Sequence, residues 1–223
     1  MINFLTAGSD KALAHILLAH GAGAPMTSLY LDAMSDLLCE RGLQVSRFEF
    51  EYMAARRDGG KRKPPPRADR LTTEYLLAVE ALHEQTPALK SGKQRLIIGG
   101  KSMGGRVASM VAQELYAAQR IFGLVCLGYP FHPPAKPENL RTAHLRDISC
   151  PTLIVQGERD PFGTRAEVQG TDGHAAYDLS PAIEMVWIPD GDHDFAPRRD
   201  SGFTRAGNLA LAADAVAAFA MPG

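Results

Sequence analysis

A short apolar run that leads directly into a glycine-flanked serine constrains the fold of this chain more than any other feature. Residues 96–98 read Leu-Ile-Ile, and the pentapeptide Gly100-Lys101-Ser102-Met103-Gly104 follows almost at once. This G-x-S-x-G pattern is typical of a tight turn from a strand into a helix, where the serine takes a strained backbone conformation and exposes its hydroxyl above the sheet. Glycine on both sides removes the Cβ atoms that would collide in such a turn. We therefore expect a strand, a sharp turn at Ser102 and a helix after it.

The rest of the chain alternates apolar runs with segments whose apolar residues recur at helical spacing. This alternation predicts an α/β fold with a mainly parallel central sheet and helices on both faces. The expected strands are residues 14–19, 45–50, 96–98, 124–127, 152–155 and 185–188, and the expected helices lie within 28–42, 71–82, 107–115 and 209–219. A long irregular loop is expected after residue 50. No internal repeat or linker divides the chain, so we predict one domain over residues 1–223, and the segment between Gly128 and Thr152 is too short for a separate lid domain.

Composition excludes several classes of protein. The 223 residues are 45% hydrophobic and 22% charged, with a formal net charge of −1, which gives no bulk reason to expect a nucleic-acid partner. Cys39, Cys126 and Cys150 are an odd number of cysteines without C-x-x-C spacing, and reduced thiols of this kind suit a cytoplasmic protein. The N-terminal segment lacks a basic region before its apolar stretch, and no apolar run approaches membrane-spanning length. We expect neither a signal peptide nor a membrane partner.

Two further residues complete a nucleophilic constellation with Ser102. A serine hydroxyl needs a base to take its proton and a carboxylate to orient that base. Asp160 follows the expected strand at 152–155, and His193 follows the one that ends at residue 188. Because the carboxyl ends of parallel strands share one edge of a sheet, all three side chains should meet there. The alternatives that the sequence leaves open are Asp190, Asp192 and Asp194 as the acid and His174 as the base.

An oxyanion hole is expected beside the serine. One donor should be the backbone N–H of Met103, at the start of the helix after the turn. The other should come from the loop His20-Gly21-Ala22-Gly23, from the N–H of Ala22 or alternatively of Gly23. His20 itself is expected to brace this loop rather than to act as a base.

Two rival sites can be rejected from the sequence. Gly100-Lys101-Ser102 matches the end of a phosphate-binding P-loop, but that motif needs a glycine where this chain has Arg95. The aspartates around His193 suggest a calcium loop, which needs Gly and Glu where the chain has Phe195 and Ser201. The remaining histidines lack metal-ligand spacing. We expect no metal and no cofactor.

Three stretches resemble the α/β-hydrolase superfamily in its compact dienelactone-hydrolase-like branch. They are Gly-Lys-Ser-Met-Gly-Gly-Arg, Tyr-Pro-Phe-His-Pro-Pro and Gln-Gly-Glu-Arg-Asp-Pro-Phe-Gly. The small predicted hydrolases related to the testis-expressed hydrolase-like proteins are the most similar, and the resemblance covers nearly the whole chain. It implies the α/β-hydrolase fold, a Ser102–His193–Asp160 triad and hydrolysis of an ester, thioester or related acyl bond. Lys101 departs from the His or aromatic residue common before the nucleophile of esterases.

Two segments are candidates for substrate contacts. Tyr129, Phe131 and His132 follow a sheet strand, so we expect their rings to line the acyl or leaving-group pocket, with a rigid packed connector as the alternative. Residues 56–70 contain seven Lys and Arg around Pro64-Pro65-Pro66. This segment is either a solvated loop or a basic rim that steers an anionic substrate or partner.

The sequence thus predicts a serine hydrolase that forms an acyl-enzyme with a small-molecule acyl substrate. An interaction protein that keeps the turn for structural reasons, and an acyltransferase that uses the same residues, are the alternatives. The sequence leaves the oligomeric state open.

Overall fold

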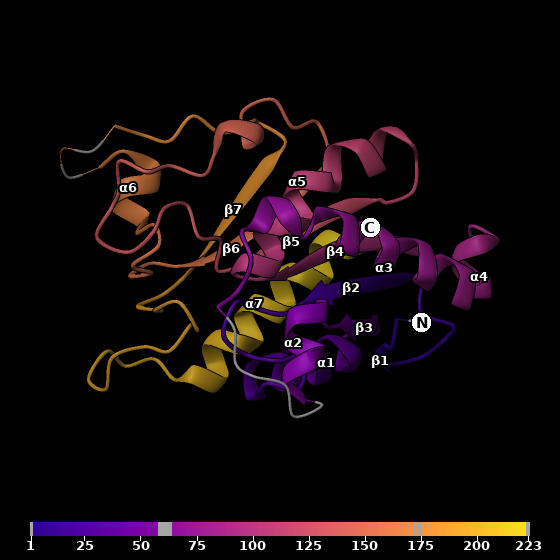
Figure 1. Ribbon diagram of the computed structural model, residues 1–223. Coiled ribbons are helices and arrows are strands. Elements are labelled where there is room, and N and C mark those ends of the chain that lie inside the picture. The colour runs from indigo at the N-terminus through magenta and orange to yellow at the C-terminus, as the bar shows by residue number, and fades with distance from the viewer. Residues whose placement is uncertain (1, 58–63, 172, 174, 222–223) are drawn as a thin grey trace.

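A seven-stranded sheet forms the centre of the molecule (Figure 1). The computed structural model describes residues 2–57, 64–171, 173 and 175–221. The strands lie in the order β1-β3-β2-β4-β5-β6-β7, and all neighbours are parallel except the edge strand β1, which pairs antiparallel with β3. Their bounds are β1 Leu5–Ala7, β2 Ala14–Ala19, β3 Gln44–Phe48, β4 Arg95–Lys101, β5 Gly123–Leu127, β6 Thr152–Gly157 and β7 Ile183–Ile188. The prediction of a mainly parallel sheet is confirmed.

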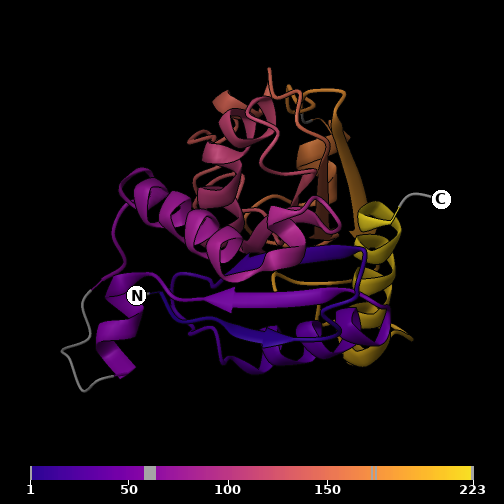
Figure 2. The same ribbon diagram turned by 90° about the vertical axis from the view of Figure 1, so that its right-hand side faces the viewer.

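Helices cover both faces of the sheet (Figure 2). Helices α1 (Leu29–Glu40) and α7 (Arg205–Ala220) pack against one another and one face, and α3 (Thr72–Gln85) and α5 (Met103–Ala117) cover the other. Successive residues of a strand point to opposite faces, so adjacent Ile97 and Ile98 of β4 enter different hydrophobic cores. This double burial explains why the strands read as continuous apolar runs.

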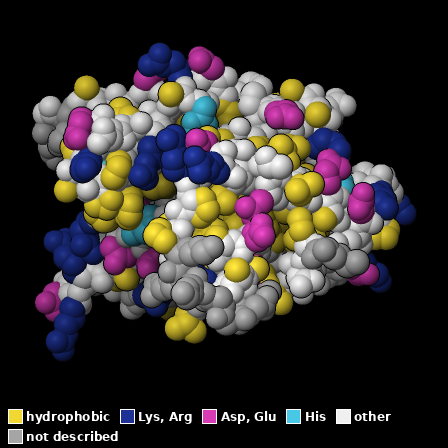
Figure 3. Space-filling model, viewed as in Figure 1, with side chains coloured by type: hydrophobic (Ala, Val, Ile, Leu, Met, Phe, Trp, Pro, Cys, Tyr) yellow, Lys and Arg dark blue, Asp and Glu magenta, His cyan; other side chains and the backbone are white. Residues whose placement is uncertain are grey.

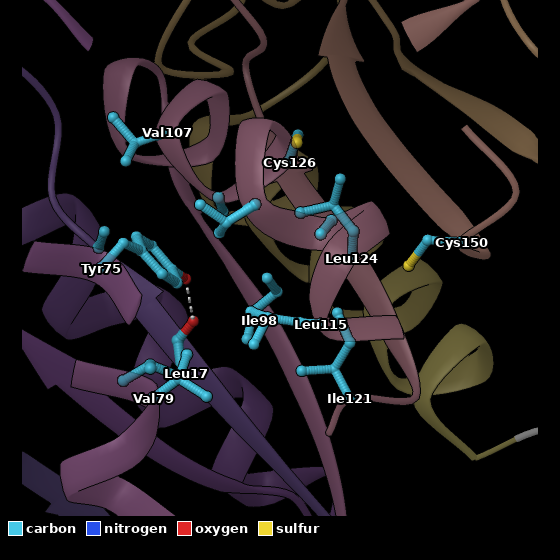
Figure 4. Close-up of a cluster of buried hydrophobic side chains, with 14 of the residues drawn as sticks. Leu17, Tyr75, Val79, Ile98, Val107, Leu115, Ile121, Leu124, Cys126 and Cys150 are labelled. Atoms are coloured by element: carbon cyan, nitrogen blue, oxygen red, sulfur yellow. Dashed lines mark hydrogen bonds between the residues drawn. The ribbon is translucent and has the colours of Figure 1, made fainter. Parts of the chain in front are cut away.

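The core under α3 and α5 contains one polar anchor (Figure 4). The Tyr75 hydroxyl lies among buried aliphatic side chains, 2.7 Å from the Gly99 carbonyl oxygen and 3.2 Å from that of Leu17 as acceptors for its one proton, and it accepts from the Gly99 N–H. A buried phenol is costly unless it has such partners. It ties α3 to the central strands β2 and β4.

Short elements occur where the sequence shows no periodic pattern. The segment after residue 50, expected as an irregular loop, begins with helix α2 (Glu51–Arg57) and continues through a 3₁₀ turn, η1 (Ala68–Arg70). Helix α4 (Pro87–Lys90), turn η2 (Ala143–Leu145) and helix α6 (Arg165–Gln169) are equally brief. One or two turns show too few repeats for a pattern to be recognised. Among the residues described, none of the helices is both long and apolar enough to cross a bilayer.

Candidate active site

The turn between β4 and α5 is as tight as the sequence predicts. Ser102 has φ 52° and ψ −116°, a conformation that non-glycine residues rarely adopt. A Cβ atom on Gly100 would lie 2.6 Å from the carbonyl oxygen of Ala19, and one on Gly104 would lie 2.5 Å from the same oxygen. Glycine at these two positions therefore lets the turn lie directly against the end of β2.

Ser102, His193 and Asp160 form a continuous hydrogen-bonded chain. The Nε2 atom of His193 lies 2.8 Å from Ser102 Oγ, and its Nδ1 atom lies 2.7 Å from Asp160 Oδ2. Asp160 is fully buried, and its carboxylate also accepts from the Phe162 N–H and the Gln156 side-chain amide. A carboxylate can only accept, so Nδ1 carries the proton and Nε2 is left to accept from the serine hydroxyl.

The three other aspartates near the base have different partners. Asp190 pairs with Arg159 and Arg198, and the Asp192 carboxylate accepts from backbone N–H groups of its own loop. Asp194 pairs with Lys101. Of the four candidate acids, Asp160 is the one in contact with the imidazole. His174, the reserve base, lies outside the described residues.

Lys101 clamps the loop that carries the base. Its Nζ donates to the His193 carbonyl oxygen at 2.6 Å, lies 3.3 Å from Asp194 Oδ1 and sits over the Tyr30 ring. The side chain is only 8% exposed, and this burial lowers the pKa of its ammonium group, while the nearby Asp194 and Asp160 carboxylates act in the opposite direction. The residue that departs from the esterase pattern thus connects the strand before the nucleophile to the loop of the base.

The loop expected to form the oxyanion hole is braced from two sides. Buried His20 lies with Nδ1 2.6 Å from the Gly21 carbonyl oxygen, and its Nε2 accepts from the Phe50 N–H, which leaves the proton on Nδ1. Burial lowers the pKa of His20 to about 4, so the ring is neutral near pH 7. The Tyr52 hydroxyl, from α2, donates to the Ala22 carbonyl at 3.0 Å.

Two cavities meet at Ser102. One, of about 650 Å³, runs between η1 and α5 and is lined by Ala22, Pro65, Pro66, Arg67, Ala68, Asp69, Ser102, Met103, Arg106, Met110, Pro130, Arg141 and Phe162. The other, of about 430 Å³, extends over the loop of the base and is lined by residues that include Tyr30, Leu31, Lys101 and His193. Ala22, Ser102 and Phe162 border both. Ser102 therefore lies at the junction of the two cavities.

The family model described as "Alpha/beta hydrolase domain" matches residues 12–221. The chain belongs to this α/β-hydrolase family. Solved structures of other hydrolases share its fold at low sequence identity. An α/β serine hydrolase homologue from Coxiella burnetii has a TM-score of 0.68 and 15% identity, covering 97% of this chain and 90% of its own. A dienelactone hydrolase from Anabaena variabilis gives 0.67 and 18%, covering 98% and 90%. Est1E from Butyrivibrio proteoclasticus, with ferulic acid bound, gives 0.65 and 16%, covering 98% and 93%.

The aromatic segment of this α/β hydrolase does not lie where the sequence suggested. Tyr129, Phe131 and His132 are at most 2% exposed and line neither cavity at Ser102. The Tyr129 hydroxyl donates to the Arg141 carbonyl, and its ring packs against Phe131. The interpretation of these three residues as a pocket wall is corrected: they form a packed connector, and Pro130 between them lines the cavity instead.

Four residues of the hydrolase site were not assigned from the sequence: Lys101, Arg106, Arg141 and Phe162. The Phe162 ring lies 4.4 Å from the imidazole of His193, between centroids. Arg106 could have been found, since it follows Ser102 by one helical turn and must share its side of α5. Arg141 comes from a loop whose position no periodic pattern in the sequence predicts.

Within the segment 56–70, Lys61, Arg62 and Lys63 lie outside the described residues, and Arg67 pairs with Asp69.

Proposed function

We propose that this α/β hydrolase is a serine hydrolase that cleaves an ester, thioester or related acyl bond through an acyl-enzyme intermediate. The single observation that carries the proposal is the chain of contacts from Asp160 through His193 to Ser102, at 2.7 and 2.8 Å, on a strained turn. This arrangement orients the base, leaves its free nitrogen on the hydroxyl and exposes that hydroxyl to two cavities.

The proposed reaction has two halves. His193 Nε2 takes the proton of Ser102 as Oγ attacks the substrate carbonyl carbon, and the N–H groups of Met103 and Ala22 hold the oxygen on which negative charge develops. When the carbonyl re-forms, the bond to the leaving group breaks and His193 returns the proton to that group. Water then attacks the acyl-enzyme by the same route, which releases the acid and restores Ser102. Asp160 stabilises the imidazolium that forms in each half.

The experiment that tests the proposal is labelling with a fluorophosphonate probe, followed by intact mass measurement. We expect one adduct on the natural sequence and none on Ser102→Ala or His193→Ala, because the probe reacts only with an activated serine. Ser91→Ala, which removes an exposed serine at the end of α4 that borders neither cavity, is the matched control and should label fully. Unchanged labelling of Ser102→Ala, or no adduct on folded protein, would contradict the proposal.

A folded protein without any adduct would favour the alternative of a non-catalytic interaction protein. If labelling succeeds, the products of ester cleavage with and without added alcohol separate a hydrolase from an acyltransferase.

We propose a small-molecule acyl substrate, with neither nucleic acid nor membrane as partner. The unpaired thiols of Cys39, Cys126 and Cys150 support a cytoplasmic location. The closer relationship to the testis-expressed hydrolase-like proteins also stands as a proposal.

A further inference from the structure

Two arginines face the larger cavity beside the nucleophile. Arg106 lies one turn after Ser102 on α5, where its N–H donates to the Ser102 carbonyl at 3.0 Å. Arg141 reaches the same cavity from the loop before η2. The backbone of Arg141 is fixed on both sides, because its N–H donates to the Phe131 carbonyl and its carbonyl accepts from the buried Tyr129 hydroxyl. Both guanidinium groups are therefore carried by rigid backbone.

Neither guanidinium has an acidic partner among the residues that the structure describes. The Nε atom of Arg106 is buried without a hydrogen-bond partner. The acid in the cavity wall, Asp69, pairs with Arg67 at 3.1 Å. The neighbouring His144 cannot compensate the two positive charges. Its ring is in contact with Ser109, and it is neutral near pH 7 because burial lowers its pKa to about 4.

The two arginines also act on each other. Burial, followed by the nearby positive charge of Arg106, lowers the pKa of Arg141 from its ordinary value. Two like charges that are partly withdrawn from water, one of them with an unmatched donor, are costly to a folded protein unless a ligand compensates them. The space in front of this pair is a cavity that opens onto Ser102.

We propose that the substrate of the serine hydrolase carries an anionic group, a carboxylate or a phosphate, that binds Arg106 and Arg141 while its acyl carbon lies at Ser102. This inference rests on the proposed function, since the reacting serine sets where the anion must sit. The planar guanidinium presents a fork of donors that matches both oxyanions. The surface view agrees with this charge distribution: Figure 3 shows Lys and Arg side chains gathered beside a hollow rimmed by hydrophobic side chains.

The test compares charged and neutral esters of equal length. The first set is 4-nitrophenyl hydrogen glutarate, its methyl-capped diester and 4-nitrophenyl 4-phosphonobutyrate, which separate carboxylate from phosphate-like recognition. The second set, 4-acetoxybenzoate and its methyl ester, places the charge on the leaving group. We expect kcat/KM for the anionic ester of at least one set to exceed that of its neutral partner about tenfold or more, as a charge-assisted contact allows.

Arg106→Gln and Arg141→Gln should each reduce this ratio several-fold, and the double variant should abolish the preference. Lysine at either position keeps the charge without the fork and should retain part of it. Arg146→Gln is the matched control, because Arg146 lies on the same segment as Arg141 but pairs with Asp178 on the surface. A preference that survives in the double variant, or an equal loss in Arg146→Gln, would overturn the inference. Working with a ratio keeps the test valid if a variant is partly unfolded.

Binding to the Ser102→Ala protein separates the two proposals. Titration calorimetry with monoethyl glutarate, diethyl glutarate and ethyl phosphate reports recognition of the anion without any turnover. Anion-selective binding by a protein that cleaves none of the esters would contradict the serine-hydrolase proposal alone. Equal cleavage of charged and neutral esters, or no detectable binding of either anion to Ser102→Ala, would overturn the anionic-substrate inference.

Discussion

At the scale of single residues, Lys101 shows how the position before the nucleophile can serve the base. Its ammonium group donates to the His193 backbone and approaches Asp194, so one buried cation contacts two consecutive residues of the loop that carries the proposed base. The peptide of Lys101 is also the last of β4, directly joined to Ser102. Lys101 is thus joined to Ser102 through its backbone and to the loop of His193 through its side chain, so it holds these two residues at a fixed separation.

Replacing Lys101 with methionine should release this loop while preserving most of the packing volume. We expect kcat to fall about 10- to 100-fold, the range for a reacting pair held slightly out of place, with KM nearly unchanged. Steady-state kinetics on an ester that the natural sequence cleaves would measure both constants. Lys136→Met, at an exposed position, is the control for loss of charge. A rise in KM with unchanged kcat would assign Lys101 to substrate binding instead.

At the scale of elements, the contact of α5 with β2 depends on a missing side chain. A Cβ atom on Gly104 would lie 2.5 Å from the Ala19 carbonyl oxygen and 2.6 Å from that of His20, and neither backbone oxygen can rotate away. Gly104→Ala should therefore lower the free energy of unfolding by about 2 kcal/mol, the usual cost of overpacking. Urea unfolding measures the loss. Gly23→Ala is the matched control, since a Cβ there would have no neighbour within 4 Å; equal stability of the two variants would contradict the packing argument.

The elements that sequence could predict are those with a repeating pattern or a compact motif. The six parallel strands and four long helices show apolar runs or helical spacing, and five consecutive residues, 100–104, are enough to predict the turn at Ser102. The edge strand β1, with three half-exposed or exposed residues, and the short helix α2 have neither. The aromatic segment after β5 was wrongly predicted to line the pocket, because strand ends at this edge border both cavity and core. Its buried position depends on contacts that the sequence does not reveal, such as the ring of Phe131 against Tyr177 and the hydrogen bond from the Tyr129 N–H to the Gln156 side chain.

At the scale of the whole molecule, the sheet brings together residues that are far apart in the chain. Ser102 and His193 are separated by 91 positions, and His193 and Asp160 by 33, yet each pair is in hydrogen-bonding contact. The sequence can predict this meeting because parallel strands share one carboxyl edge. It could not predict Arg141, whose position depends on a loop anchored by the fold. Distance along the chain matters less than whether a residue follows a strand.

The stability of the whole molecule should fall in mild acid because three histidines are partly or fully buried: His15 on β2, His20 just after it and His144 in η2. Burial lowers the pKa of His15, His20 and His144 from 6.5 to about 4. Between these values the unfolded chain binds protons that the folded protein does not, so folding weakens as the pH falls. Each histidine contributes a slope of about 1.4 kcal/mol per pH unit at most.

Urea unfolding at pH 7, 6 and 5 would measure this slope above the range in which carboxylates titrate strongly. We expect the free energy of unfolding to decrease across the series. His15→Gln should flatten the decrease by one histidine's share, because His15 is in contact with Ser46 and Gln94, two polar groups that an uncharged amide can also engage. His15 contacts neither cavity at Ser102, so activity of this variant at pH 7 serves as the folding control. Constant stability from pH 7 to 5 would show that these histidines become protonated within the folded protein.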